Sequence, residues 1–101
     1  MNAQTNQPLF SPGQLLMTPG ALQAMAEAQQ EPMDFLQRHF AGDWGDLDDE
    51  DKQENELSLR EGYRLLSAYH TNLNVKLWVI TEAADEAGNR AASTILLPSE
   101  Y

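Results

Sequence analysis

The sequence predicts a small α+β domain in which a mostly antiparallel three-stranded sheet has helices packed on one face, in the order β-α-α-α-β-β. Three observations lead to this prediction. Apolar residues recur at helical spacing in three successive segments, and two runs rich in β-branched residues follow them. The length of 101 residues is that of one domain with one core.

A short strand and a helix open the predicted domain. Residues 14–17 form an apolar run, which we interpret as a brief strand. Thr18 is a good N-cap and Pro19 suits the first helical position, so we expect a helix to begin there. Pro32 ends this helix and can open a second one, because proline is tolerated only in the first turn. Phe40 closes the apolar pattern of the second helix, and Gly42 stands where a C-terminal glycine cap belongs.

The third helix is predicted over residues 49–69. Asp48 or Asp49 can cap it, and acidic residues fill its first turn, where negative charge is favourable. Gly62 lies inside this predicted helix at a cost of about 1 kcal/mol relative to alanine, which a close contact between helix and sheet would explain. Glu56 and Arg60 have the spacing of a helical ion pair.

Two strands complete the prediction. Residues 75–81 are apolar on both faces, which is typical of a central strand. Residues 72–74 form a turn before it, residues 85–89 a hairpin connection after it, and residues 93–97 the returning strand, which Pro98 ends. We interpret residues 1–10 as a disordered N-terminal tail and residues 11–101 as the single domain.

The composition limits the function classes. The net charge of −10 disfavours direct binding to nucleic acid or to anionic membranes, and favours basic proteins or divalent cations as partners. The chain has no cysteine, so thiolate metal sites and disulfides are excluded. We find neither a signal peptide nor a membrane-spanning run, and we therefore expect a cytoplasmic protein. We predict no cofactor.

The strongest local feature is an acidic segment that contains a tryptophan. Eight of the sixteen acidic residues lie between Asp43 and Glu56, and Trp44 stands close to two glycines at its start. An exposed Trp44 would be a candidate for the centre of an interface, since tryptophan is enriched there. The predicted partner-binding residues are then Asp43, Trp44, Asp46, Asp48 and Asp49. A buried Trp44 would instead anchor the loop to the core.

A second hypothesis places a divalent metal or an enzyme site at His39, Asp43 and Glu82. Histidine and carboxylates together can bind such a metal. His39 has a competing role as the basic residue at a helix C-terminus. No serine nucleophile lies near this histidine in the sequence, and Ser67 and Ser93 are candidates only if the fold brings them close.

The acidic run does not match a calcium-binding EF-hand loop. Such a loop needs glycine at its sixth position and glutamate at its twelfth. Counted from Asp46, these positions hold Asp51 and Leu57. A solvated helix N-terminus explains the run better.

Several segments together resemble a family of uncharacterised bacterial proteins found on plasmids and genomic islands. They are LMTPGAL at residues 16–22, HFAGDWG at 39–45, GYRLLSAY at 62–69, WVITEA at 78–83 and ILLPSEY at 95–101. Members are labelled plasmid-related proteins or type I restriction–modification subunits. A methyltransferase subunit needs a glycine-rich nucleotide loop on a doubly wound sheet, which this chain lacks. Relative to the family, residues 84–88 are inserted before Arg90.

We therefore expect a non-enzymatic accessory or regulatory protein of mobile-element origin, which binds a protein partner through its acidic loop. A basic nucleic-acid-binding protein is one candidate partner, if the acidic face imitates nucleic acid. The alternative is a protein or enzyme that binds a small ligand or metal through His39, Asp43 and Glu82. The sequence leaves the oligomeric state open.

Overall fold

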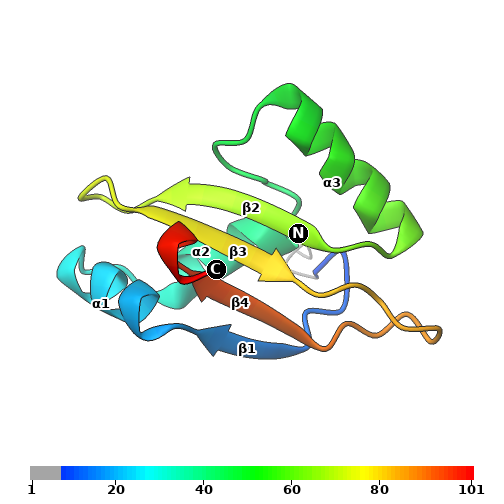
Figure 1. Ribbon diagram of the computed structural model, residues 1–101, viewed down its shortest axis with the longest axis horizontal. Coiled ribbons are helices and arrows are strands. Elements are labelled where there is room, and N and C mark those ends of the chain that lie inside the picture. Colours follow the sequence, from blue (N-terminus) through cyan, green and yellow to red (C-terminus); the bar gives the residue numbers. More distant parts are fainter. Residues whose placement is uncertain (1–7) are drawn as a thin grey trace, which may run out of the picture.

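A computed structural model describes residues 8–101 of the chain, and a mixed four-stranded sheet forms its centre (Figure 1). The strands are β1 (Gln14–Met17), β2 (Leu65–His70), β3 (Lys76–Thr81) and β4 (Ala92–Leu96), arranged in the order β1-β4-β3-β2. β1 runs parallel to β4, and the other two pairs are antiparallel. The α+β class is thus confirmed. The prediction of three strands is wrong, because β2 is an additional strand.

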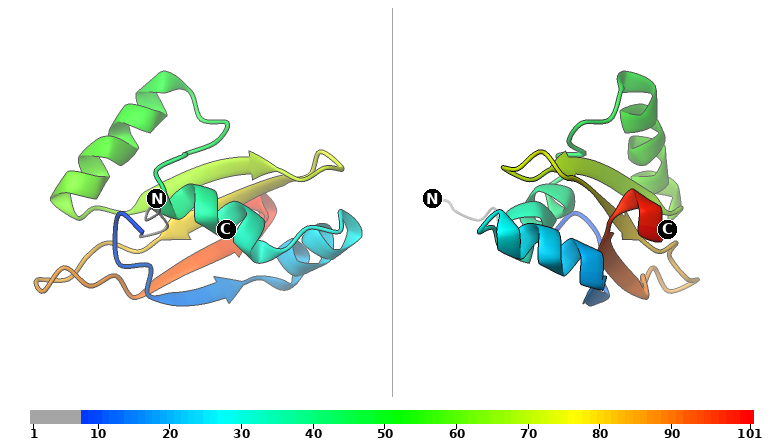
Figure 2. Two further views of the ribbon diagram at one scale, coloured as in Figure 1. Left: turned by 180° about the vertical axis from the view of Figure 1, so that it is seen from behind. Right: turned by 60° about the vertical axis from the view of Figure 1, so that its left-hand side comes forward.

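Two helices cover one face of this sheet. They are α1 (Pro19–Glu27) and α2 (Pro32–Phe40), and Figure 2 shows both on the same side. The third helix, α3 (Asp49–Glu61), lies beyond the β2 edge. The short 3₁₀ helix η1 (Pro98–Glu100) lies on the sheet face opposite α1 and α2. The prediction of helices on one face therefore holds for α1 and α2.

The ends of α1 and α2 follow the predicted capping signals. The Thr18 hydroxyl accepts a hydrogen bond from the Ala21 amide, and Pro19 occupies the first helical position. After α2, Gly42 adopts a left-handed conformation with φ 84°, and the Asp43 amide donates to the Arg38 carbonyl at 2.9 Å. This pair of features is the Schellman motif that glycine permits.

The predicted third helix is too long. It ends at Glu61, because Gly62 caps it in a left-handed conformation with φ 82°. Residues 65–70 form β2, and within it Leu65, Ser67 and Tyr69 are all buried at strand spacing. The expected ion pair with Arg60 is also missing from the described residues, since Glu56 accepts a hydrogen bond from Trp44 instead.

The hydrophobic core lies between the sheet and the pair α1 and α2. Its buried members are Ala21, Ala24, Met25, Phe35, Leu36, Phe40, Tyr69, Leu77, Val79 and Ile95. Phe10 packs against this core, and the Leu9 amide donates to the Phe40 carbonyl at 2.9 Å. The predicted tail over residues 1–10 falls mostly outside the described residues, but its last part belongs to the domain.

The chain itself closes the β2 edge of the sheet. Gly45 forms a parallel bridge with Ala68, whose amide donates to the Trp44 carbonyl and whose carbonyl accepts from the Asp46 amide. The Asn55 side chain hydrogen-bonds both the amide and the carbonyl of Leu66, at 3.1 and 2.6 Å. An amide side chain thus replaces a neighbouring strand at Leu66. Within residues 8–101, none of the helices has the length and apolarity to cross a bilayer.

We expect Gly45→Ala to destabilise the fold far more than Gly88→Ala. Both glycines have positive φ, 78° and 84°, so both variants incur a backbone cost of about 1 kcal/mol. A Cβ at Gly45 would lie 2.0 Å from the Ala68 carbonyl oxygen, whereas one at Gly88 meets nothing within 4 Å. We therefore predict a loss of at least about 3 kcal/mol for Gly45→Ala. Urea unfolding of the two variants measures the difference, and equal losses would contradict the closed edge.

Candidate functional site

A chain of hydroxyl groups and one imidazole crosses the polar end of the core. His39 extends from α2 and is fully buried; its Nδ1 lies 2.6 Å from Ser67 Oγ and its Nε2 2.9 Å from Thr81 Oγ1. Thr81 Oγ1 lies 2.7 Å from Ser93 Oγ, which donates to the Pro12 carbonyl at 2.7 Å. We call this set the hydroxyl chain. It joins α2, three strands and the segment before β1.

The carbonyl at one end fixes the direction of every hydrogen bond in the hydroxyl chain. Ser93 has one hydroxyl proton and gives it to Pro12, so Thr81 must donate to Ser93. The Thr81 hydroxyl is then an acceptor toward His39, which makes Nε2 the protonated nitrogen. Nδ1 is left as an acceptor, and Ser67 donates to it. Both ring nitrogens are satisfied only when the imidazole is neutral.

Apolar surroundings keep His39 neutral. The rings of Phe10 and Trp44 stand edge-on to the imidazole, with centroids at 5.4 and 5.7 Å. Burial, and to a smaller extent the nearby positive charge of Arg90, together lower the pKa of His39 from 6.5 to about 3. The histidine is therefore uncharged over the whole neutral range.

The fold brings Ser67 and Ser93 into the neighbourhood of His39, as the nucleophile hypothesis required. A serine hydroxyl that donates to an imidazole is the first part of a nucleophile–base pair. Here, however, both Ser67 and His39 have no exposed surface. The other ring nitrogen faces the neutral hydroxyl of Thr81, where an orienting carboxylate would be expected. The pair therefore satisfies buried polar groups and offers no position for a substrate.

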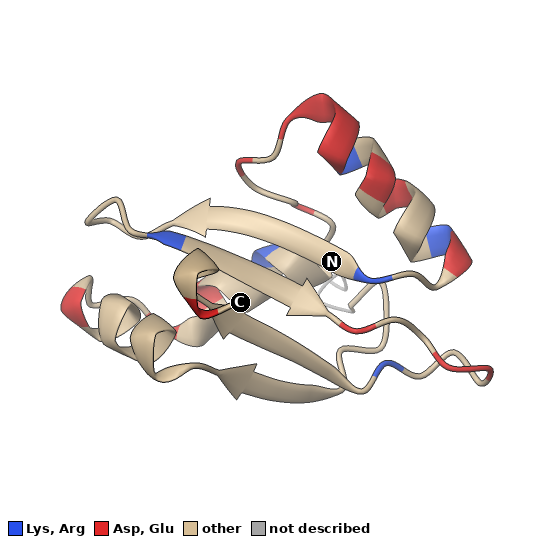
Figure 3. Ribbon diagram, viewed as in Figure 1, with Lys and Arg blue, Asp and Glu red and all other residues tan. Residues whose placement is uncertain are grey.

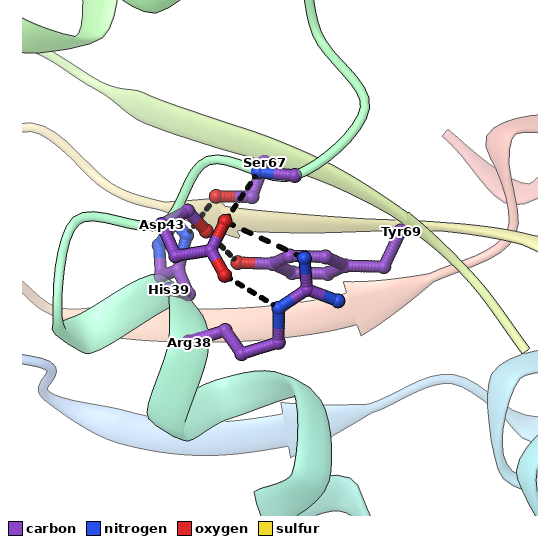
Figure 4. A network of polar contacts seen from close by, with 6 residues as sticks. Arg38, His39, Asp43, Ser67 and Tyr69 are labelled. Carbon is purple, nitrogen blue, oxygen red and sulfur yellow. Dashed lines mark hydrogen bonds and ion pairs between the residues drawn. The ribbon is translucent and has the colours of Figure 1, made fainter.

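Several contacts hold Asp43 at the protein surface, close to the hydroxyl chain (Figure 4). Its carboxylate pairs with Arg38 Nε at 2.7 Å and accepts from the Gly45 amide at 3.2 Å, while its carbonyl accepts from the Tyr69 hydroxyl. The hydrogen bond from Arg38 holds the pKa of the Asp43 carboxyl below its ordinary value. The Arg38 guanidinium also lies 4.5 Å from the centre of the Tyr69 ring. These contacts fix the turn after α2.

Trp44 is buried, with only 3% of its surface exposed. Its Nε1 donates to Glu56 of α3 at 2.8 Å, so the ring links the loop to both the core and the helix. The anchor interpretation is therefore the one that the structure shows. Burial removes the basis for predicting that Trp44 contacts a partner, because the ring fills the space beside His39.

The other predicted partner-binding residues are exposed, but all of them except Asp49 have internal partners, Asp43 through Arg38 as described above. Asp46 pairs with His70 at 2.7 Å, and Asp48 caps α3 by accepting from the Asp51 amide at 2.8 Å. Asp49 lies exposed in the first turn of α3. Of the five predicted residues, Asp49 is thus the one whose side chain has no internal hydrogen bond or ion pair within residues 8–101.

The residues of the metal hypothesis do not converge. Both nitrogens of His39 are used by hydroxyl groups, and Asp43 is paired with Arg38. Glu82 follows Thr81 in the strand direction, so its side chain projects to the opposite face of the sheet. It lies there in a depression of about 430 Å³ with Arg64 and Tyr101. No group of three potential ligands in residues 8–101 is placed to hold a metal.

Acidic residues concentrate along α3 (Figure 3). Glu50, Glu54, Leu57 and Glu61 are all exposed and follow one another at intervals of four, three and four residues, which places them on one face. The buried residues of the helix, Asn55 and Ser58, lie on an adjoining face. We call residues 50, 54, 57 and 61 the acidic stripe. The helix that carries it is joined to the rest of the domain by hydrogen bonds of Asn55, Glu56 and Ser58.

Two structural residues gave weak signals in the sequence. Thr81 and Ser93 occupy inward positions two residues from Val79 and Ile95, so the strand period alone would have placed them in the core. Arg90 gave no such signal, although it is 5% exposed and donates to three main-chain carbonyls, those of Ser58, Tyr63 and Glu82. It joins the end of α3 to the end of β3.

Comparison with protein-family models, with curated proteins and with solved structures finds no match to this chain.

We predict that acid destabilises the protein through His39 before the carboxylates titrate. The folded state holds the pKa of His39 near 3, whereas the unfolded chain has 6.5, so the unfolded state binds the proton first as the pH falls. The contribution of His39 to the free energy of unfolding is fully present above pH 6.5. Below this pH it declines by about 1.4 kcal/mol per pH unit, which amounts to about 2 kcal/mol by pH 5.

Urea unfolding between pH 7 and pH 5 measures this decline. We expect His39→Gln to lower stability and to flatten the pH dependence more than His70→Gln, the control in which an exposed histidine is removed. Nitrogen NMR at pH 5 should still show the neutral ring of His39 with its proton on Nε2. An unchanged slope in His39→Gln, or a charged ring at pH 5, would show that the assignment is wrong.

Proposed function

We propose that this chain is a non-enzymatic accessory protein that binds a basic protein partner through α3. One observation carries the proposal. Asp49, Glu50, Asp51 and Glu54 are exposed, and their carboxylates make no hydrogen bond or ion pair with any of residues 8–101. The remaining acids of the segment, which are Asp43, Asp46, Asp48 and Glu56, all have internal partners.

The uncompensated charges lower the stability of α3. Glu50 and Glu54 are like charges at helical spacing, which costs a few tenths of a kcal/mol. Lys52 is the one basic residue between Asp43 and Glu56, and the described contacts give it no ion pair. A cationic surface from another protein would remove this repulsion, and the helix dipole does so only near the first turn.

The spacing of the acidic stripe supports a protein surface as partner. Along the helix axis, Glu50 and Glu54 are about 6 Å apart, and Glu54 and Glu61 about 10 Å. This is sparser than duplex DNA, which has one charge per about 1.7 Å, so imitation of a duplex is less well supported than contact with a basic helix or patch. Leu57 lies between the carboxylates and is 37% exposed, which adds an apolar contact. Origin from a mobile genetic element stays part of the proposal, on the resemblance described above.

The test compares two variants with the same net charge. Asp49→Asn, Glu50→Gln and Glu54→Gln together remove three charges from α3 and leave the Asp48 cap intact. Glu27→Gln, Glu82→Gln and Glu86→Gln together remove three charges elsewhere. We expect the α3 variant to lose at least tenfold in affinity for a helical peptide with lysines on one face, and to lose captured basic proteins from a bacterial lysate. The control variant should keep both.

The salt dependence and the control decide the outcome. Because exposed charges are screened, binding should weaken as ionic strength rises. Equal weakening in the two variants would mean that net charge alone attracts the peptide, and the proposal would then be wrong. Thermal unfolding of both variants confirms that α3 remains folded.

A further inference from the structure

The two edges of the sheet differ in a way that points to a second interface. The β2 edge is closed by Gly45 and Asn55, as described above. At the other edge, the amides of Gln14 and Thr18 point toward the β4 segment and donate to the carbonyls of Ala91, just before β4, and of Ile95. The alternation of a strand then directs the amides and carbonyls of Leu15 and Met17 outward, where nothing within residues 8–101 pairs with them.

Apart from its short length, β1 lacks the devices that normally protect an edge strand. Natural edges use lysine, proline or a bulge to prevent pairing with another chain. The four residues of β1 include no charge and no proline, and its regular register with β4 contains no bulge. Leu15 and Leu16 are 41% and 40% exposed, on opposite faces of the strand.

The charge distribution favours a second copy of this chain as the occupant. Two chains with a charge of −10 repel each other, and the repulsion is smallest where acidic side chains are farthest away. The acidic stripe lies beyond β2, at the opposite edge from β1, and Figure 3 shows no charged residue on β1. An interface at β1 thus keeps the two acidic helices apart.

We propose that two copies of this chain pair antiparallel through β1. In a two-fold arrangement the same patch serves both chains, and the outward groups of Leu15 can exchange both hydrogen bonds with the partner's Met17. Leu16 then lies on the two-fold axis opposite its own copy. The sheet continues from one chain into the other. Because four residues a side bury less than a standard interface, the dimer is weak and forms with rising concentration.

Sedimentation equilibrium tests the dimer over ~10 μM to ~1 mM, the range expected for a contact of this size. The wild type should approach twice the mass of one chain. Leu15→Pro removes an amide that β4 does not use, and proline is tolerated at such an edge position. Leu16→Lys places like charges on the axis. Each variant should weaken the dimer at least tenfold. Leu73→Lys introduces the same charge in the β2–β3 turn, at a leucine that is 60% exposed, and should leave the dimer unchanged.

Salt separates this proposal from the one on α3. Screening weakens the repulsion between two acidic chains, so the dimer should strengthen with salt, whereas partner binding through α3 should weaken. A wild type that is monomeric at ~1 mM would overturn the proposal. The proposal would also be wrong in that case if the β1 edge bound a strand of another protein. A dimer that survives in folded Leu15→Pro and Leu16→Lys would overturn it as well, because a different surface would then be responsible.

Discussion

The structure depends on the complete satisfaction of one buried histidine. An unpaired polar atom in a core costs about 1–3 kcal/mol, and His39 would bring two of them. Ser67 of β2 and Thr81 of β3 remove this cost, but only while both strands keep their positions relative to α2. Ser93 and Pro12 extend the same requirement to β4 and to the segment that leads into β1. One neutral imidazole thus specifies the relative placement of most of the domain.

The unpaired charges and the packed interior lie in different parts of the molecule. The hydroxyl chain and the apolar core lie between the sheet and the α1–α2 layer, whereas most of the unpaired carboxylates lie on α3. The link between these two parts is Trp44, which contacts His39 with its ring and Glu56 with its nitrogen. An indole close to two glycines in an acidic segment therefore holds the acidic helix in place. The surface proposed for recognition is therefore the helix and does not include the indole.

The sequence predicts those elements whose limits are set by residues close together in the chain. The starts of α1 and α2, the Gly42 cap and the central strand β3 all follow from capping residues or from a short apolar run. β2 was missed because residues 59, 63 and 66 also fit a helical stripe, and only its pairing with β3 decides for a strand. The hydroxyl chain joins residues from four distant segments, so no spacing in the sequence predicts it. The exposed acids of α3 needed no tertiary contact and were expected.

The position of Trp44 gives the molecule an optical reporter of its own core. The chain has two tryptophans, and only Trp44 stands against an imidazole, 5.7 Å from His39. A charged imidazole quenches indole emission by accepting an electron, and a neutral one does so weakly. Proton uptake by His39 would therefore dim one of the two fluorophores, while Trp78, which lies beside Tyr101 on the other face, would serve as an internal reference. Loss of order in the hydroxyl chain would thus change the wavelength and intensity of the protein's own tryptophan fluorescence, without any attached dye.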